Sequence, residues 1–180
     1  QREKVVKALQ AKGVAEKNKT TYFPRLPLKI GLITADDSRA KSDFLHQLET
    51  SLFKVNILFR SAPMQGEEVA SQVILAIEEL TRAGCEAIAI TRGGGSAADL
   101  RWFDDPNLGL AVCESTVPII AAIGHHDDTC VVEIVAFQRC KTPTAAADFL
   151  SDCYRVFRDE MLAAEEALNH QLSWHLSNAR

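Results

Sequence analysis

Short apolar runs alternate with amphipathic segments along this chain, and the two patterns predict strands and helices in turn. Four short runs rich in apolar and β-branched residues predict strands, at 28–34, 54–59, 86–91 and 118–123. Helical spacing is clearest in 66–83, where one face carries Val69, Val73, Ala76, Ile77 and Leu80. Buried strands that alternate with helices are typical of a parallel sheet covered on both faces.

Boundary residues predict the other helices. The stretch 36–38 (Asp-Asp-Ser) supplies an N-cap for a helix over 41–52. Thr142 followed by Pro143 is typical of a helix start, with Thr142 as the N-cap. Further helical segments are expected at 97–103, 107–115 and 127–138. The predicted fold is therefore α/β: an open, mostly parallel sheet of about four strands with helices on both faces, plus a long C-terminal helix.

Three segments define the expected domain organisation. Residues 1–27 combine helical composition with a proline-bounded linker, 28–150 form the α/β domain, and 151–180 begin the long helix. That helix is expected to lead into a coiled coil because it carries an apolar seam at Leu162, Leu168, Leu172 and Leu176. Since the sequence starts without Met and ends inside a helical pattern, we expect it to be part of a longer protein.

Cysteine usage and hydropathy indicate where the protein works. The five cysteines are odd in number and lack C-x-x-C spacing, which argues against a disulfide framework and a zinc knuckle. No apolar run approaches the ~20 residues of a membrane helix, and no signal peptide is present. We therefore expect a cytoplasmic protein that does not span a membrane.

The net charge of −4 conceals an uneven distribution. Residues 1–30 contain eight Lys and Arg against two Glu, so the rest of the chain is strongly acidic. A basic arm on an acidic body permits local contact with a polyanion, although exposed lysines more often contact only water.

A glycine-rich loop follows the strand at 86–91: Arg92, the three glycines 93–95, and Ser96. Three glycines allow unusual backbone angles, so that several N–H groups can point at one anion, and a following helix start adds a favourable dipole. The alternative is a plain strand-to-helix turn. The match to a dinucleotide fingerprint is only formal, because the loop follows the third strand and opens with a charged residue.

A second polar loop, Gly124-His125-His126-Asp127-Asp128, follows the strand at 118–123. Loops at the carboxyl ends of parallel strands converge, so this loop and the glycine loop are expected to lie together. If a helix begins here, His125 and Asp128 share a face, and the carboxylate can hold the imidazole for proton transfer. The alternatives are that an aspartate only caps the helix, or that the cluster binds a metal ion.

Three ordered motifs resemble the catalytic domain of the exodeoxyribonuclease VII large subunit family. They are Arg92-Gly93-Gly94-Gly95-Ser96-x-x-Asp99-Leu100, Gly124-His125-x-x-Asp128 and Arg139-x-x-Thr142-Pro143-Thr144-Ala145-Ala146-Ala147. The resemblance covers nearly the whole chain. It implies an active site formed by Asp43, Arg92, His125 and Asp128, although Asp43 alone would be taken for a solvent-facing acid. It further implies substrate contacts from Gly93, Gly94, Gly95, Ser96, Arg139 and Thr142.

The resemblance also implies an activity and partners. The implied activity is hydrolysis of single-stranded DNA to short oligonucleotides from either end, without a required divalent metal or other cofactor. The implied partners are an OB-fold domain before residue 1 and several copies of a small subunit, which bind to the downstream coiled coil. The chain departs from the family pattern at His126, Asp127, Cys130, Glu133, Phe137 and Lys141. A phosphate-binding module without hydrolytic activity, a metal-dependent phosphoesterase and a scaffold built around the terminal helix remain the alternatives.

Overall fold

The computed structural model describes residues 1–50, 54–94, 97–124 and 129–178. Its elements, in chain order, are α1 (Arg2–Ala11), η1 (Asn18–Thr20), β1 (Lys29–Thr34), α2 (Arg39–Glu49), β2 (Asn56–Ser61), α3 (Val69–Arg82), β3 (Ala87–Thr91), η2 (Ala97–Asp104), α4 (Pro106–Glu114), β4 (Ile119–Ala122), α5 (Val131–Val135), β5 (Gln138–Arg139) and α6 (Pro143–Asn178).

The strands form one sheet in the order β2-β1-β3-β4-β5, and each pairing between them is parallel. The predicted α/β class and open parallel sheet are confirmed. The sheet has a fifth strand, however. It begins at the last residue of the segment 127–138, which was predicted as one helix. Within the described part of this segment, 129–138, only α5 is α-helical, and the two residues of β5 pair with Ile120 and Ala121. A two-residue polar edge strand has no apolar run by which the sequence could reveal it.

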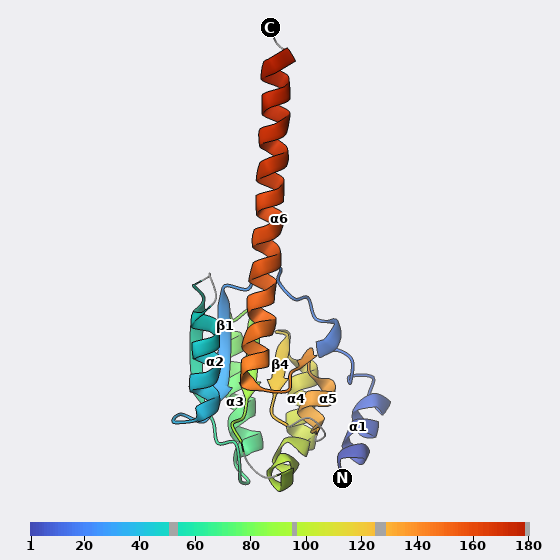
Figure 1. Ribbon diagram of the computed structural model, residues 1–180. Coiled ribbons are helices and arrows are strands. Elements are labelled where there is room, and N and C mark those ends of the chain that lie inside the picture. The colour runs from blue at the N-terminus through green and yellow to red at the C-terminus, as the bar shows by residue number, and fades with distance from the viewer. Residues whose placement is uncertain (51–53, 95–96, 125–128, 179–180) are drawn as a thin grey trace.

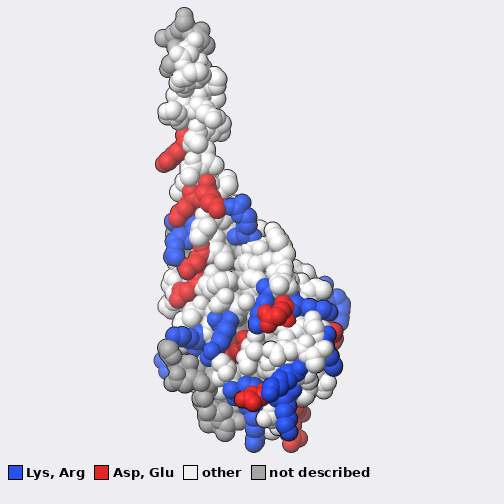
Figure 2. All heavy atoms as spheres, turned by 90° about the vertical axis from the view of Figure 1, so that its right-hand side faces the viewer, with Lys and Arg blue, Asp and Glu red and all other residues white. Residues whose placement is uncertain are grey.

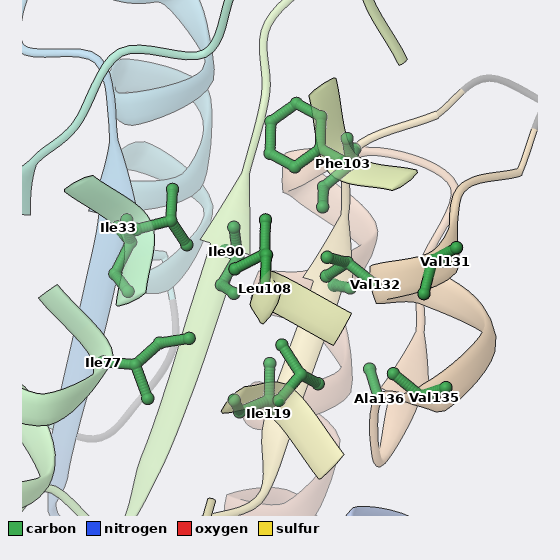
Figure 3. Packing of buried hydrophobic residues seen from close by; sticks show 14 of the residues in the cluster. Ile33, Ile77, Ile90, Phe103, Leu108, Ile119, Val131, Val132, Val135 and Ala136 are labelled. Atoms are coloured by element: carbon green, nitrogen blue, oxygen red, sulfur yellow. The ribbon is translucent and has the colours of Figure 1, made fainter. Parts of the chain in front are cut away.

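Alternating side chains of the central strands divide the core into two layers. Ile33, Ile88 and Ile90 face one cluster, together with α1, α3, α4 and α5. Ile30 and Leu32 face the other cluster, which is completed by α2 and the first half of α6. Figure 3 shows the first cluster, with Ile90 and Ile119 of the sheet against Leu108 and Val132 of the helices.

Close approach of helix to sheet depends on one glycine in β1. A Cβ added to Gly31 would lie 2.8 Å from Leu80 Cδ1 and 3.1 Å from Ile88 Cγ1. Any side chain at this position would therefore force the packed side chains of Leu80 and Ile88 to shift.

The segment before β1 packs onto the sheet domain. Val5, Leu9, Val14 and Ala15 are buried in the first cluster. Asn18 is fully buried, and its amide donates to Ser115 O and Val117 O while Oδ1 accepts from Ile119 N and Phe137 N. The helix and turn of 1–20 thus share the core of the α/β domain. The domain boundary at residue 27 stays a prediction.

Helix α6 runs antiparallel to the strands and continues well past the sheet (Figure 1). Its start, Thr142, lies at the carboxyl end of the sheet, and Tyr154 reaches the opposite end, where its hydroxyl donates to Pro27 O just before β1. Beyond that point large apolar side chains are exposed, at Val156, Met161, Leu162, Leu168, Leu172 and Trp174. The predicted long helix is confirmed, and the coiled coil stays a prediction. No helix among the described residues is long and apolar enough to cross a membrane.

Candidate active site

A cleft opens at the carboxyl end of the sheet, where β1, β3 and β4 end side by side. Its volume is about 230 Å³. The described residues that line it include five that the sequence predicts for the site: Asp43, Arg92, Gly93, Gly94 and Thr142. These residues come from α2, the glycine loop and the start of α6, so the fold brings together segments that are about a hundred residues apart in the chain.

Arg92 lies at the base of the cleft with its orientation constrained. Its backbone nitrogen donates to Ala122 O at 2.9 Å, which holds the loop to β4. Its side chain is only 7% exposed, and Nη2 donates to Asp99 Oδ2 at 3.2 Å. A guanidinium held this way is already oriented before an anion arrives, which reduces the cost of binding.

Gly93 and Gly94 contribute something other than the unusual angles that the sequence predicts. Among the described glycines, positive φ occurs only at Gly13, Gly66 and Gly84. Gly93 instead packs against the first turn of α2, where an added Cβ would lie 3.5 Å from Ala40 N. The two glycines therefore leave the wall of the cleft without side chains, so that a ligand can approach the backbone.

Asp43 is the exposed acid of the cleft. It lies on α2, its side chain is 46% exposed, and Arg39 Nε lies 3.9 Å from its Oδ2. The helix is positioned by its N-cap, which is Ser38 of the predicted stretch 36–38. Its Oγ accepts from Lys41 N at 3.2 Å and lies 3.1 Å from Thr34 Oγ1 at the end of β1. Asp43 can therefore reach a ligand without breaking a strong contact.

Thr142 closes the cleft from the side of α6. Its Oγ1 accepts from Ala145 N at 3.0 Å, as expected for the N-cap of this helix, and lies 2.8 Å from Thr144 Oγ1. Thr144 and Lys141 also line the cleft. Two threonines and a lysine thus line the same cleft as Arg92.

His125, Asp128, Gly95 and Ser96 lie outside the described residues. Gly124, directly before His125, lines the cleft. The four remain predictions from the sequence.

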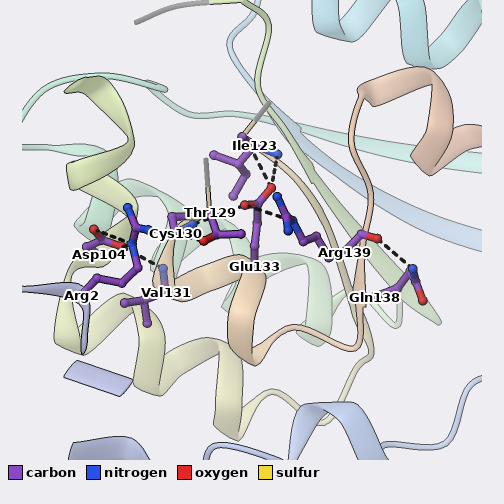
Figure 4. Close-up of polar contacts among 10 residues, drawn as sticks. Arg2, Asp104, Ile123, Thr129, Cys130, Val131, Glu133, Gln138 and Arg139 are labelled. Carbon is purple, nitrogen blue, oxygen red and sulfur yellow. Dashed lines mark hydrogen bonds and ion pairs between the residues drawn. The ribbon is translucent and has the colours of Figure 1, made fainter. Parts of the chain in front are cut away.

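Glu133 was not predicted from the sequence as a residue of the site. Its side chain is fully buried, and Oε1 accepts from Ile123 N at 3.1 Å and Gly124 N at 2.9 Å, while Oε2 accepts from Cys130 N at 3.3 Å (Figure 4). One carboxylate therefore joins both ends of the loop that carries His125 and Asp128. The available signal was its spacing: Glu133 is the third residue after the N-cap Cys130, as in a capping box.

Arg139 pairs with this carboxylate. Its Nε lies 3.6 Å from Glu133 Oε2, and it is absent from the described lining of the cleft. Arg139 thus lies beside Glu133, where it offsets the charge of a buried acid.

A second buried acid connects the N-terminal helix to the same loop. Asp104 Oδ1 accepts from Val131 N at 2.8 Å and from Arg2 Nε at 3.3 Å. Arg2 also donates to Thr129 Oγ1 at 3.4 Å. The basic segment therefore borders the far end of the loop, and Figure 2 shows its face of the body with many Lys and Arg side chains. The exposed lysines of this segment are Lys4, Lys7, Lys12, Lys17 and Lys19.

Four of the five cysteines, Cys85, Cys113, Cys130 and Cys140, are buried, and Cys153 is half-buried. Burial raises the pKa of Cys113 and of Cys140 to about 11, and it raises the pKa of Cys85 and Cys130 as well. None of the described residues that line the cleft is a cysteine. Nor do the described residues contain a group of three or more His, Cys, Asp or Glu placed to hold a metal ion.

A larger hollow, of about 680 Å³, lies between α3 and α4. Ile77, Leu110 and Glu114 are among its lining, and none of the predicted site residues that the structure describes is there. The larger of these two cavities is therefore not the one that the sequence motifs indicate.

Comparison with known proteins identifies the family. Residues 14–180 match the family model described as "Exonuclease VII, large subunit". The exodeoxyribonuclease 7 large subunit of Koribacter versatilis (strain Ellin345) is 36% identical over 172 residues, covering 95% of this chain and 36% of that protein. The exodeoxyribonuclease 7 large subunit of Hahella chejuensis (strain KCTC 2396) is 30% identical over 162 residues, covering 89% of this chain and 36% of that protein.

The chain spans about a third of the length of these two relatives. The family match covers nearly all of the chain, including every residue of the cleft. The chain belongs to the exonuclease VII large subunit family.

Proposed function

We propose that this chain is the catalytic part of an exonuclease that hydrolyses single-stranded DNA, from either end, to short oligonucleotides. The observation that carries the proposal is the cleft, which is lined by Arg92, by the bare backbone at Gly93 and by the exposed Asp43. A fixed cation beside accessible backbone suits a phosphodiester, and a nearby acid suits activation of water.

In the proposed reaction, Arg92 and the glycine-loop amides bind the scissile phosphate and stabilise the charge that builds on it. Water attacks phosphorus and the bond to the leaving sugar oxygen breaks. His125, oriented by Asp128, either takes the proton from water or donates one to the leaving oxygen. Asp43 positions the water or acts as the partner base. No divalent metal or other cofactor is required in this scheme.

The assembly is also part of the proposal. The basic face of α1 borders the active-site loop and would guide the strand toward the cleft. An OB-fold domain before residue 1 would grip the strand. The exposed apolar side chains of α6, from Val156 to Trp174, would pack in a coiled coil that recruits small subunits in several copies. We place the complex in the cytoplasm, in keeping with five free cysteines.

The test uses the complete large subunit assembled with its small subunit and an end-labelled single strand in EDTA. We expect degradation to oligonucleotides, and we expect His125→Ala to abolish it while single-strand binding persists. Activity that appears only after magnesium is added would identify a metal-dependent phosphoesterase. Tight nucleotide binding without turnover would identify a binding module, and turnover by His125→Ala would remove His125 from the mechanism.

A further inference from the structure

A second cavity adjoins the cleft on the other side of the glycine loop. Its volume is about 540 Å³, and it shares Arg39, Arg92, Gly93 and Gly94 with the first cavity. Because four residues line both, the two cavities are neighbouring lobes of one groove that passes the glycine loop. The outer lobe is completed by Ala35, Ser38, Pro63, Met64 and Gln65.

The two lobes differ in charge. Arg39 and Arg92 lie on the shared wall, and the inner lobe adds Asp43 and Lys141. Among its described lining the outer lobe adds no charged side chain. It offers apolar surface from Ala35, Pro63 and Met64, and neutral polar groups from Ser38 and Gln65. An anion therefore fits the shared wall, and a neutral, largely apolar group fits the outer lobe.

Backbone hydrogen bonding and burial hold the segment after β2, which forms part of the outer lobe, in place. Ala62 N donates to Thr34 O at 3.1 Å, which carries the β1–β2 pairing one step past β2, and Ala62 and Met64 are both buried. Gly66, with φ of +96°, then turns the chain toward α3. The Ser38 hydroxyl is already engaged as the cap of α2. Gln65, whose side chain is exposed, is thus the polar group of this lobe best placed to contact a ligand.

We propose that the outer lobe binds the nucleoside next to the scissile phosphate, with its base against Pro63 and Met64 and its polar edge at Gln65. This inference rests on the proposed function, because it places the scissile phosphate at the shared wall. A DNA strand alternates phosphates with neutral nucleosides, as the two lobes alternate in charge. An amide both donates and accepts hydrogen bonds, so it can contact any base without selecting one.

The test measures kcat/KM for cleavage at each phosphodiester of a single strand that carries one abasic nucleotide, using the complete holoenzyme. We expect cleavage at one bond beside the abasic position to slow by roughly tenfold, the scale of one lost base contact. In Gln65→Ala we expect slower cleavage of intact DNA and an abasic penalty of about threefold at that bond, because one of the base contacts is already gone.

Gln72→Ala is the matched control, since Gln72 is an exposed glutamine on α3 outside the described cavities, and it should keep the full penalty. Normal degradation of intact DNA with no abasic penalty at any bond would overturn this inference and leave the proposed function standing. A full penalty retained in Gln65→Ala would place the base elsewhere. Absence of any degradation of intact DNA would instead count against the proposed function.

Discussion

Two acidic side chains at the same end of the sheet differ in almost every physical respect. Asp43 faces the cleft, is 46% exposed, and has Arg39 at 3.9 Å. Glu133 lies in the packed interior below, has no exposed side-chain area, accepts from three backbone N–H groups and pairs with Arg139. An acid whose oxygens are all occupied holds structure in place, whereas an acid open to water is available to a substrate.

Three arginines near these acids also differ in exposure and in the acids that they contact. Arg139 lies beside the buried Glu133, and Arg39 has a side chain that is 90% exposed. Arg92 is nearly buried and paired with Asp99, and yet it lines both lobes of the groove. A cation that is both fixed and accessible is suited to stabilising a transition state.

Among the described residues, the largest effect on activity is expected for Asp43→Asn. The amide keeps the size of the side chain but cannot take a proton, so kcat in the holoenzyme should fall by roughly 10²–10⁴-fold, the usual contribution of an acid–base group. The melting temperature should not change, because the contact with Arg39 is long and exposed. Asp37→Asn, an exposed aspartate outside the described cavities, is the control. Normal turnover by Asp43→Asn would show that exposure in the cleft does not imply catalysis.

Glu133→Gln should act in the opposite way, mainly on stability. The new NH2 group would face donors, either Cys130 N–H and Arg139 or the N–H groups of Ile123 and Gly124, and buried groups left unsatisfied cost about 1–3 kcal/mol. We expect a lower free energy of unfolding in urea and a lower kcat, with Glu133→Asp restoring part of both. Unchanged stability would mean that this carboxylate does not hold the loop. Glu67→Gln, an exposed glutamate, is the control.

Asp99→Asn should have a smaller effect, because its side chain is 28% exposed and water can partly replace it. Loss of the charged partner weakens one contact that orients the Arg92 guanidinium, and we expect kcat/KM to fall roughly fivefold, equivalent to about 1 kcal/mol. Steady-state kinetics at two salt concentrations would measure it. A loss as large as that of Asp43→Asn would mean that Asp99 has a direct role in the reaction.

The smallest effect is the one that titration of the buried cysteine thiols is expected to have on stability. Burial raises the pKa of Cys113 and Cys140 to about 11, so in the folded protein they stay protonated and react slowly with disulfide reagents at pH 8. The unfolded chain releases these protons near the ordinary value of 9.0, so the contribution to stability is complete below pH 9 and decreases as the pH rises toward 11. Thiol titration of native and urea-unfolded protein would check both points. Rapid native labelling of either cysteine would contradict the burial.

Local signals in the sequence were sufficient for most elements. Thr142 caps α6 as predicted, Ser38 of the predicted stretch 36–38 caps α2, and the four predicted strands are present within two residues of their expected bounds. Three features depend on distant contacts. Strand β5 exists because Gln138 and Arg139 lie beside β4, Asn18 is buried because it satisfies four distant backbone groups, and Glu133 bonds backward to the end of β4.

The sequence by itself determined the α/β order of elements, the family motifs and the side chains available for phosphate chemistry, because periodicity, capping and motif spacing are properties of neighbouring residues. Only the tertiary structure decided that Arg139 pairs with the buried Glu133, that Arg92 is held by Asp99, and that the groove has a second lobe whose described lining adds no charged side chain beyond the two shared arginines. Those outcomes depend on which segments meet when two faces of a sheet are buried, and spacing along one chain does not contain that information.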